Sequence, residues 1–226
     1  MAIESVAPPA RREVIQADAL AYLNEHAAQV DDAIITSLPD VSELSTCTLA
    51  TWRAWFVDTV RLVVRWIPEQ SVAIFFQSDI RREAEWIDKG YLVMKAAELE
   101  GATLIWHKIV CRRPAGTVAV GRPSYSHMLC LSRAVGNMPL RPGPDVLPDA
   151  GYMPWSRAMG VSACRVACQY LLDETSVKRV VDPFCGQGTV LAVANALGLN
   201  ALGIELGGKR CRVARNLRID LNPAEK

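Results

Sequence analysis

A glycine-containing loop between an apolar segment and a helical one is the strongest chemical signal in this 226-residue sequence. The stretch "VVDPFCGQGTVLAVANALGLNALGIEL", residues 180–206, places Asp182 before the loop and both Gly186 and Gly188 within it. Glycines let the backbone turn tightly and approach a ligand, and a helix N-terminus offers free N–H donors. Glu205 ends the next apolar run, where its carboxylate can accept hydrogen bonds from both hydroxyls of a ribose. Together these features favour a nucleoside-binding site over an ordinary strand-to-helix turn.

A second candidate site is "TSLPD", residues 36–40, at the end of the apolar run "AIIT". Ser37 can accept a hydrogen bond, Pro39 can stiffen the loop, and Asp40 can take a proton from a substrate nitrogen. An aspartate before a helical segment also commonly caps it, so the sequence leaves both roles for Asp40 open.

Other reactive side chains favour structural roles. We expect Cys185, within the glycine loop, to be unreactive, and His107, near the end of an apolar run, to be structural. Cys164 and Cys168 would share one helix face, where packing is favoured over metal binding. None of the seven cysteines forms a Cys-x-x-Cys pair, and with His107 and His127 they give no familiar zinc spacing. We therefore predict no metal site.

Composition limits the class of protein. A formal charge of +1, from 25 basic and 24 acidic residues, gives no overall field for a polyanion, so nucleic-acid contacts would use local patches. The sequence shows no signal peptide and no apolar stretch of membrane-spanning length. We expect a reduced, soluble, cytoplasmic protein of one domain with no membrane partner.

Strand-like and helix-like segments alternate along the chain. Short β-rich runs are predicted at 12–18, 32–37, 71–78, 102–110, 125–132, 177–182 and 200–205. Helices are predicted at 48–66, 81–101 with a break at Gly90, 156–173, 189–198 and 208–217. Residues 134–155 are rich in proline and glycine and are predicted to form an irregular surface segment. This alternation favours an α/β fold, with a mostly parallel sheet covered by helices on both faces.

At the glycine loop the sequence resembles the S-adenosylmethionine site of the amino-methyltransferases that modify nucleobases, whose signature is Asp-Pro-Phe-x-Gly-x-Gly-Thr. The resemblance implies a Rossmann-like fold with a seven-stranded sheet and the permuted, beta-class motif order, in which the catalytic half comes first. It assigns residues 12–133 to the catalytic half, 134–155 to the surface segment, and 156–226 to the S-adenosylmethionine-binding half of a single methyltransferase domain.

The resemblance also implies which residues hold the cofactor. Asp18 would meet the adenine and Glu205 the ribose. The full predicted cofactor set comprises Asp18, Ser37, Asp182, Pro183, Phe184, Cys185, Gly186, Gly188, Thr189, Glu205 and Leu206.

In the family's catalytic loop, Asp, Asn or Ser is followed by Pro-Pro-Tyr; the first two residues hold the target amine and the aromatic ring stacks on the base. Here the predicted catalytic residues are Ser37, Leu38, Pro39 and Asp40, so Leu38 replaces a proline and Asp40 replaces the aromatic residue. We interpret this loop as modified for catalysis, with Asp40 as the base.

The predicted substrate is structured RNA, such as transfer or ribosomal RNA. Relatives that act on DNA usually carry a long recognition insert, and only 134–155 is available here. Side chains proposed to contact the RNA are Arg112, Arg113, Arg122, Tyr125 and Trp155. The alternatives are a DNA adenine or cytosine amino-methyltransferase, and a non-catalytic subunit that binds S-adenosylmethionine or RNA. A monomer or a homodimer is possible.

Overall fold

An eight-stranded sheet forms the centre of the computed structural model, which describes residues 9–44, 46–82, 84–134 and 143–221. Its strand order is β1-β10-β9-β2-β3-β7-β6-β8. The strands are β1 (Arg12–Gln16), β2 (Asp32–Thr36), β3 (Val72–Gln77), β6 (Thr103–Cys111), β7 (Tyr125–Ser132), β8 (Val146–Leu147), β9 (Arg179–Asp182) and β10 (Asn200–Glu205). The sheet therefore joins strands from the first and last thirds of the chain.

Most strand pairs are parallel. β1, β10, β9, β2 and β3 run parallel to one another, whereas β7 is antiparallel to both β3 and β6. The expectation of seven strands was wrong, because the two-residue strand β8 pairs with β6 at the edge of the sheet. A pairing this short leaves no periodic pattern in the sequence.

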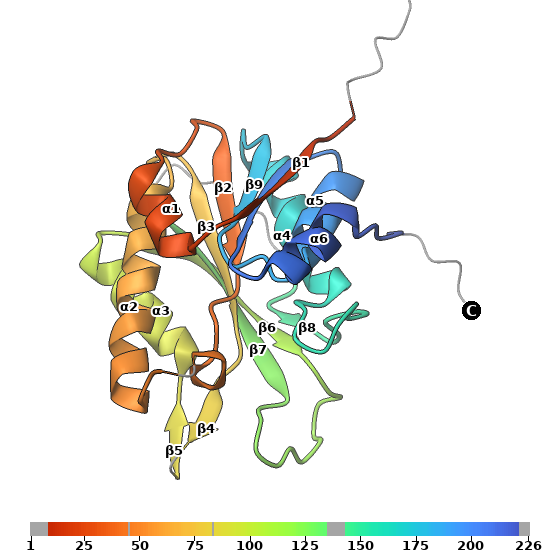
Figure 1. The fold of residues 1–226 in the computed structure, drawn as a ribbon. Coiled ribbons are helices and arrows are strands. Elements are labelled where there is room, and N and C mark those ends of the chain that lie inside the picture. The colour runs from red at the N-terminus through yellow and green to blue at the C-terminus, as the bar shows by residue number, and fades with distance from the viewer. Residues whose placement is uncertain (1–8, 45, 83, 135–142, 222–226) are drawn as a thin grey trace, which may run out of the picture.

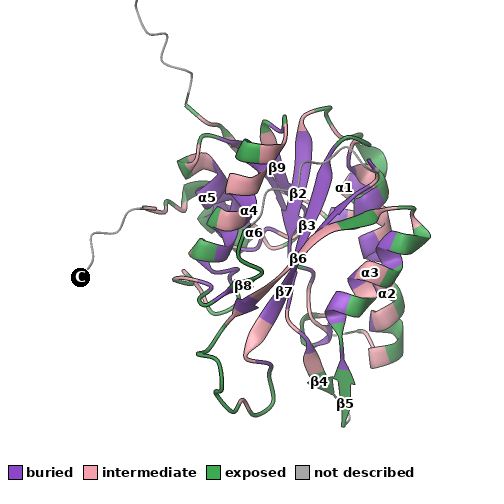
Figure 2. Ribbon diagram, turned by 180° about the vertical axis from the view of Figure 1, so that it is seen from behind, coloured by how far each residue is buried: buried purple, intermediate pink, exposed green. Residues whose placement is uncertain are grey.

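Helices cover both faces of the sheet (Figure 1). One group lies on the left in that view: α1 (Ala19–Glu25), α2 (Leu49–Trp66) and α3 (Lys89–Leu99). The other group is α4 (Val161–Glu174), α5 (Thr189–Ala196) and α6 (Gly208–Asn216). Figure 2 shows the central strands β9, β2 and β3 as buried, whereas β6 is mostly of intermediate burial. In the described part of the chain, no helix is long and apolar enough to span a bilayer.

The spacing of apolar side chains explains how α2 packs. Trp52, Phe56, Val60 and Val63 are fully buried and lie three or four residues apart, on one helical face. Thr48 caps the helix, since its side chain accepts a hydrogen bond from Thr51 N. α2 thus forms one wall of the core behind the catalytic-loop region.

The segment 81–101, predicted to be helical throughout, instead begins with a β-hairpin. Strands β4 (Ile80–Arg82) and β5 (Glu85–Ile87) pair antiparallel, and Ala84 takes a positive φ of 63° at their turn. Asp88 then starts α3, because its carboxylate accepts a hydrogen bond from Tyr91 N. The predicted break at Gly90 was also wrong, since Gly90 lies inside the first turn of α3.

The carboxyl ends of the central strands face the same side of the molecule. Ile34 of β2 pairs with Val181 of β9, so the loops after these strands leave the sheet side by side. The β4–β5 hairpin and the loop 112–124 also extend beyond this edge, at the bottom of Figure 1. Of the proline- and glycine-rich segment, residues 135–142 lie outside the described residues, and the helix expected from 156 begins at Val161.

Candidate functional site

The two predicted loops meet in one cavity of about 350 Å³ at the carboxyl ends of β1, β10, β9 and β2. We call it the glycine-loop cavity. Predicted site residues that line it are Asp18, Ser37, Leu38, Pro39, Asp182, Pro183, Phe184, Cys185, Gly186, Thr189, Glu205, Leu206 and Trp155. Residues far apart in the sequence are therefore brought together as the motifs predicted.

The glycine loop can be formed only with glycine at two positions. Gly186 and Gly188 have φ values of 54° and 83°, in the left-handed region. A Cβ atom on Gly186 would lie 2.9 Å from the Trp155 ring, and one on Gly188 would lie 2.8 Å from Ala214 Cβ. Gly188 is not among the residues lining the cavity, so its role is to pack the loop against α6.

Asp182 connects the two loops. Its Oδ1 accepts hydrogen bonds from Thr36 Oγ1 at 2.7 Å and from Phe184 N at 3.1 Å. Burial raises the pKa of Asp182 to about 7, with the charge of Glu205 adding to the effect and the two hydrogen bonds opposing it. The end of β2 and the start of the glycine loop are thus fixed by one carboxyl group.

Two further acidic residues border the cavity. Glu205 is buried at the end of β10, and its Oε1 accepts a hydrogen bond from Gly207 N at 2.7 Å. Asp18 caps α1 by accepting a hydrogen bond from Ala21 N at 2.9 Å. Both carboxylates are held in place by backbone amides, so each presents a fixed acceptor to a ligand with hydroxyl or amine donors.

The loop 37–40 separates the glycine-loop cavity from a smaller one. Ser37 and Leu38 line both cavities. Leu38 is also buried in the core, which explains an apolar residue at this position. Trp52 Nε1 donates a hydrogen bond to Pro39 O at 3.2 Å, which holds the loop backbone against α2.

Asp40 caps the short 3₁₀ helix η1 (Val41–Glu43). Its Oδ1 accepts a hydrogen bond from Val41 N at 2.8 Å, and Glu43 Oε1 accepts one from Asp40 N at 3.1 Å. This capping box is the structural role that the sequence left open. Asp40 lines the smaller cavity, so capping leaves its carboxylate facing that space.

The smaller space, the Lys89 cavity, has a volume of about 100 Å³, and two of its polar lining residues, Gln77 and Lys89, were not predicted from the sequence. Lys89 is buried, with Nζ 3.7 Å from Asp40 Oδ1, and its burial lowers its pKa against the opposing effect of Asp40. Gln77, at the end of β3, also lines this cavity. No local motif marks either residue, because only the fold brings them to the loop 37–40.

An ion pair that the sequence did not indicate spans the border between the cavities. Arg157 Nη1 lies 2.6 Å from Glu43 Oε2, and both residues line both cavities. Because Arg157 precedes α4 and Glu43 belongs to η1, the pair holds together the segments on either side of the site.

The predicted substrate-binding residues are divided among several places. Arg112 and Arg122 line the Lys89 cavity, whereas Arg113 and Tyr125 are not among the residues lining either cavity. Trp155 lines the glycine-loop cavity, and its Nε1 donates a hydrogen bond to Thr189 Oγ1 at 3.2 Å. The structure therefore does not bring these five residues together as one surface.

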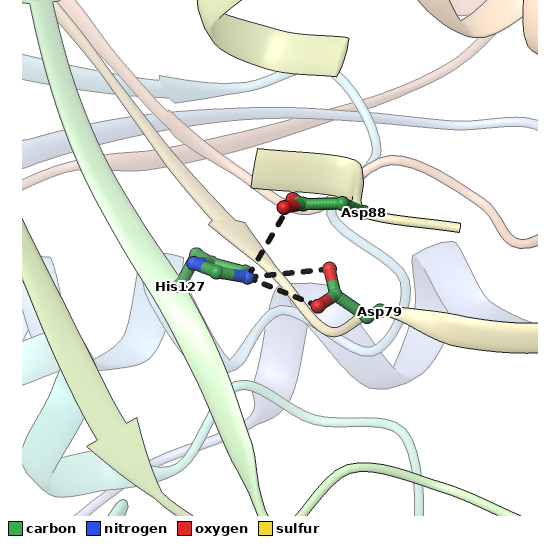
Figure 3. A group of neighbouring side chains, drawn as sticks. All are labelled: Asp79, Asp88 and His127. Carbon is green, nitrogen blue, oxygen red and sulfur yellow. Dashed lines mark hydrogen bonds and ion pairs between the residues drawn. The ribbon is translucent and has the colours of Figure 1, made fainter. Parts of the chain in front are cut away.

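A cluster of Asp79, Asp88 and His127 lies beside the Lys89 cavity (Figure 3). His127 Nε2 is 3.2 Å from Asp79, and Nδ1 is 3.0 Å from His107 Nε2. Asp79 also accepts a hydrogen bond from Lys89 N at 2.8 Å. Within the described residues this is the one group with the spacing of metal ligands. Its hydrogen bonds give it a structural role, because they hold the start of α3 in place.

Comparisons with known proteins agree with this geometry. Residues 175–216 match a protein-family model described as DNA methylase. TTHA0409 of Thermus thermophilus, provisionally named a DNA modification methylase and solved with S-adenosylmethionine, is 17% identical; the match has a TM-score of 0.68 and covers 91% of each chain. The PvuII DNA methyltransferase, described as cytosine-N4-specific, is 12% identical, with a TM-score of 0.67 over 96% of this chain and 89% of that one.

A third solved chain, the M1.HpyAVI complex with S-adenosylmethionine, is 14% identical, with a TM-score of 0.62. The match covers 91% of this chain and 100% of that one. No curated protein is significantly similar in sequence. At these identities the likeness shows the fold. The chain therefore has the mixed α/β fold, with a large and mostly parallel sheet, of these methyltransferase structures.

Proposed function

We propose that this protein transfers a methyl group from S-adenosylmethionine to the exocyclic nitrogen of adenine or cytosine in DNA. The observation that carries the proposal is the glycine-loop cavity, in which the loop 182–188 and Glu205 face Ser37 and Leu38 across one space. A site for the methyl donor and a loop able to hold an amine are thereby adjacent. S-adenosylmethionine supplies a methyl group on a positively charged sulfur.

Residues of the glycine-loop cavity fit such a donor. Glu205 would accept hydrogen bonds from the ribose hydroxyls, and Asp18 would accept one from the adenine amine. Phe184 and Leu206 add apolar side chains to the lining of the cavity. Gly186 lines the cavity without a side chain of its own, so its backbone is available to a ligand beside Trp155.

Residues of the loop 37–40 would handle the target amine. Ser37 Oγ and the carbonyl of Leu38 would accept its two N–H groups, which directs the nitrogen lone pair at the methyl group. Asp40 then accepts the proton that the nitrogen loses on methylation. Asp40 stands where the family usually has an aromatic residue that stacks on the target nucleobase. Without that ring, the nucleobase would enter the Lys89 cavity.

DNA is preferred to RNA as the substrate, which reverses the preference drawn from the sequence. That preference rested on the short recognition region. However, this chain covers 89% of the PvuII DNA methyltransferase and 91% of TTHA0409, so its small size does not distinguish the two substrates. The family model matched by residues 175–216 is also described as DNA methylase.

Exposed arginines on two protrusions near the Lys89 cavity would contact phosphates. The hairpin 80–87 carries Arg81 and Arg82, and the loop 112–124 carries Arg113 and Arg122, all exposed. Both extend beyond the carboxyl edge of the sheet (Figure 1). Phosphate contacts of this kind position a nucleic acid without reading its sequence.

Methyl transfer to matched polymers tests this function. The protein is incubated with labelled S-adenosylmethionine and either an unmodified amplified DNA or an RNA transcript of the same sequence, and the nucleosides are then identified by mass spectrometry. We expect N6-methyladenine or N4-methylcytosine in the DNA. Label found only in RNA would support the RNA enzyme, and donor binding without transfer to either polymer would support a non-catalytic subunit.

A further inference from the structure

Gln77 carries a buried amide whose Nε2 has no partner among the residues that the structure describes. Its side chain is 1% exposed, and Nε2 makes no hydrogen bond to any described residue. Four other buried side chains among the described residues have such an atom, and Gln77 is the one of the five that lines the Lys89 or glycine-loop cavity. Burying an amide donor without a partner is unfavourable, so a ligand that pairs with it gains affinity.

The position of Gln77 puts this amide next to the proposed catalytic loop. Gln77 is the last residue of β3, and β3 lies beside β2, with Phe75 paired to Thr36. The residues that follow Thr36 are Ser37 and Leu38, which line the Lys89 cavity together with Gln77. A molecule held by Ser37 and Leu38 from this side would therefore lie against Gln77.

Three of the four cationic side chains that line the same cavity have partners, and the fourth, Arg122, is exposed at its rim. Lys89 faces Asp40, Arg112 Nη1 lies 3.0 Å from Ser78 Oγ, and Arg157 pairs with Glu43. The Gln77 amide differs from them because it is neutral, buried and unpaired. It is suited to a neutral ligand with hydrogen-bonding groups, and not to a phosphate.

A primary amide offers an N–H donor and a carbonyl acceptor side by side. A group that pairs with both must place an acceptor opposite the N–H and a donor opposite the carbonyl. Adenine and cytosine both carry an exocyclic amine next to a ring nitrogen that accepts hydrogen bonds. Glutamine pairs with adenine in this two-bond manner in DNA complexes. Uracil and thymine lack the amine.

We propose that Gln77 is a specificity-determining residue that donates a hydrogen bond from Nε2 to the ring nitrogen beside the target amine. This inference rests on the proposed function and extends it, because it places the Watson–Crick or Hoogsteen edge of an amino-substituted base against the end of β3. A donor at this point favours bases whose ring nitrogen beside the amine accepts a hydrogen bond, as in adenine and cytosine, while Ser37 and Leu38 hold both N–H groups of the amine itself.

Gln77→Met, which keeps the length of the side chain and removes the amide, tests the inference. We expect kcat/KM for DNA to fall by about ten- to a hundred-fold and the affinity for S-adenosylmethionine to change by less than about two-fold. Thermal stability of the ligand-free protein should stay the same or rise, because an unpaired buried amide is removed. Gln169→Met on α4, whose amide binds Asp173 at 2.8 Å, is the matched control and should leave transfer unchanged.

Substrate analogues then identify the partner of the amide. DNA is prepared with a C–H group in place of adenine N1, adenine N7 or cytosine N3, according to which base the parent protein methylates. For one of these analogues, the parent should lose at least about ten-fold in kcat/KM, and Gln77→Met should lose nothing further.

Each outcome bears on a different claim. Additive losses in the variant and the analogue, or a lower melting temperature with unchanged transfer for Gln77→Met, would overturn the role of Gln77 alone. A parent protein that binds S-adenosylmethionine but methylates no DNA would overturn the proposed function, and the role of Gln77 with it.

Discussion

The glycine-loop cavity and the Lys89 cavity adjoin the same loop, 37–40, but are built in different ways. The first is formed mainly by contiguous segments: the loop 182–188, the end of β10 and the start of α1. The second is formed by single side chains from distant elements, among them Gln77 and Lys89. A methyl donor common to many enzymes can be bound by a short motif, whereas the cavity for the methyl acceptor depends on the whole fold.

This difference predicts that substitutions in one cavity leave the function of the other intact. Variants of the glycine-loop cavity should weaken binding of S-adenosylmethionine. Variants of the Lys89 cavity should slow methyl transfer at unchanged affinity for it. The following experiments address that separation.

Asp40→Asn is expected to have the largest effect. Asparagine caps a helix as well as aspartate does, so η1 should be retained, but its amide cannot take a proton. Methyl transfer should slow by about a hundred-fold or more, the size of a general-base contribution, with binding of S-adenosylmethionine nearly unchanged. Rates from single-turnover kinetics and affinities from calorimetry measure the two quantities. Transfer at the parental rate would leave Asp40 with the capping role alone.

Glu205→Ala is the corresponding change in the glycine-loop cavity. Losing a buried carboxylate that accepts hydrogen bonds costs about 1.5 to 3 kcal/mol, so affinity for S-adenosylmethionine should fall by about ten- to a hundred-fold. Glu13→Ala, at an exposed position on β1, is the control. Calorimetry giving the parental affinity for Glu205→Ala would remove Glu205 from the donor site.

Asp182 should make stability depend on pH. Its pKa in the folded chain is about 7, above the ordinary 3.8, so the folded chain holds this proton more tightly than the unfolded chain does. Its contribution to the free energy of unfolding is therefore largest at acidic pH and declines as pH rises from about 4 to about 7. Asp182→Asn, whose Oδ1 can still accept from Thr36 and Phe184, should remove this slope in denaturant titrations. Parallel curves for parent and variant would argue against a raised pKa.

Arg122→Gln should give the smallest effect. Arg122 lies on the loop 112–124 at the rim of the Lys89 cavity, where it would contact phosphate. Affinity for DNA should fall a few-fold for any sequence, and the slope of log affinity against log salt should decrease by about 1. Fluorescence anisotropy at several salt concentrations measures both. An effect confined to one DNA sequence would instead indicate base contact.

The placement of the candidate site residues could be predicted from sequence where chemistry and local structure coincide, and their roles stay predictions. The glycine loop, Glu205 and Ser37 each follow an apolar strand, and parallel strands bring their carboxyl ends to one edge of the sheet. The hairpin 80–87 was missed because its charged residues fit a helical pattern, and its turn depends on the positive φ of Ala84. Gln77 and Lys89 were missed because their burial follows from tertiary packing and not from their neighbours in sequence.

The central claim is that the donor and the target amine meet at Ser37 and Leu38, on the border between the two cavities. A crystal structure of the protein with S-adenosylhomocysteine tests it most directly. We expect the ribose hydroxyls at Glu205, the amino-acid part along the loop 182–188, and the sulfur facing Ser37 and Leu38. A ligand bound elsewhere, or one whose sulfur is shielded from the loop 37–40, would contradict the account.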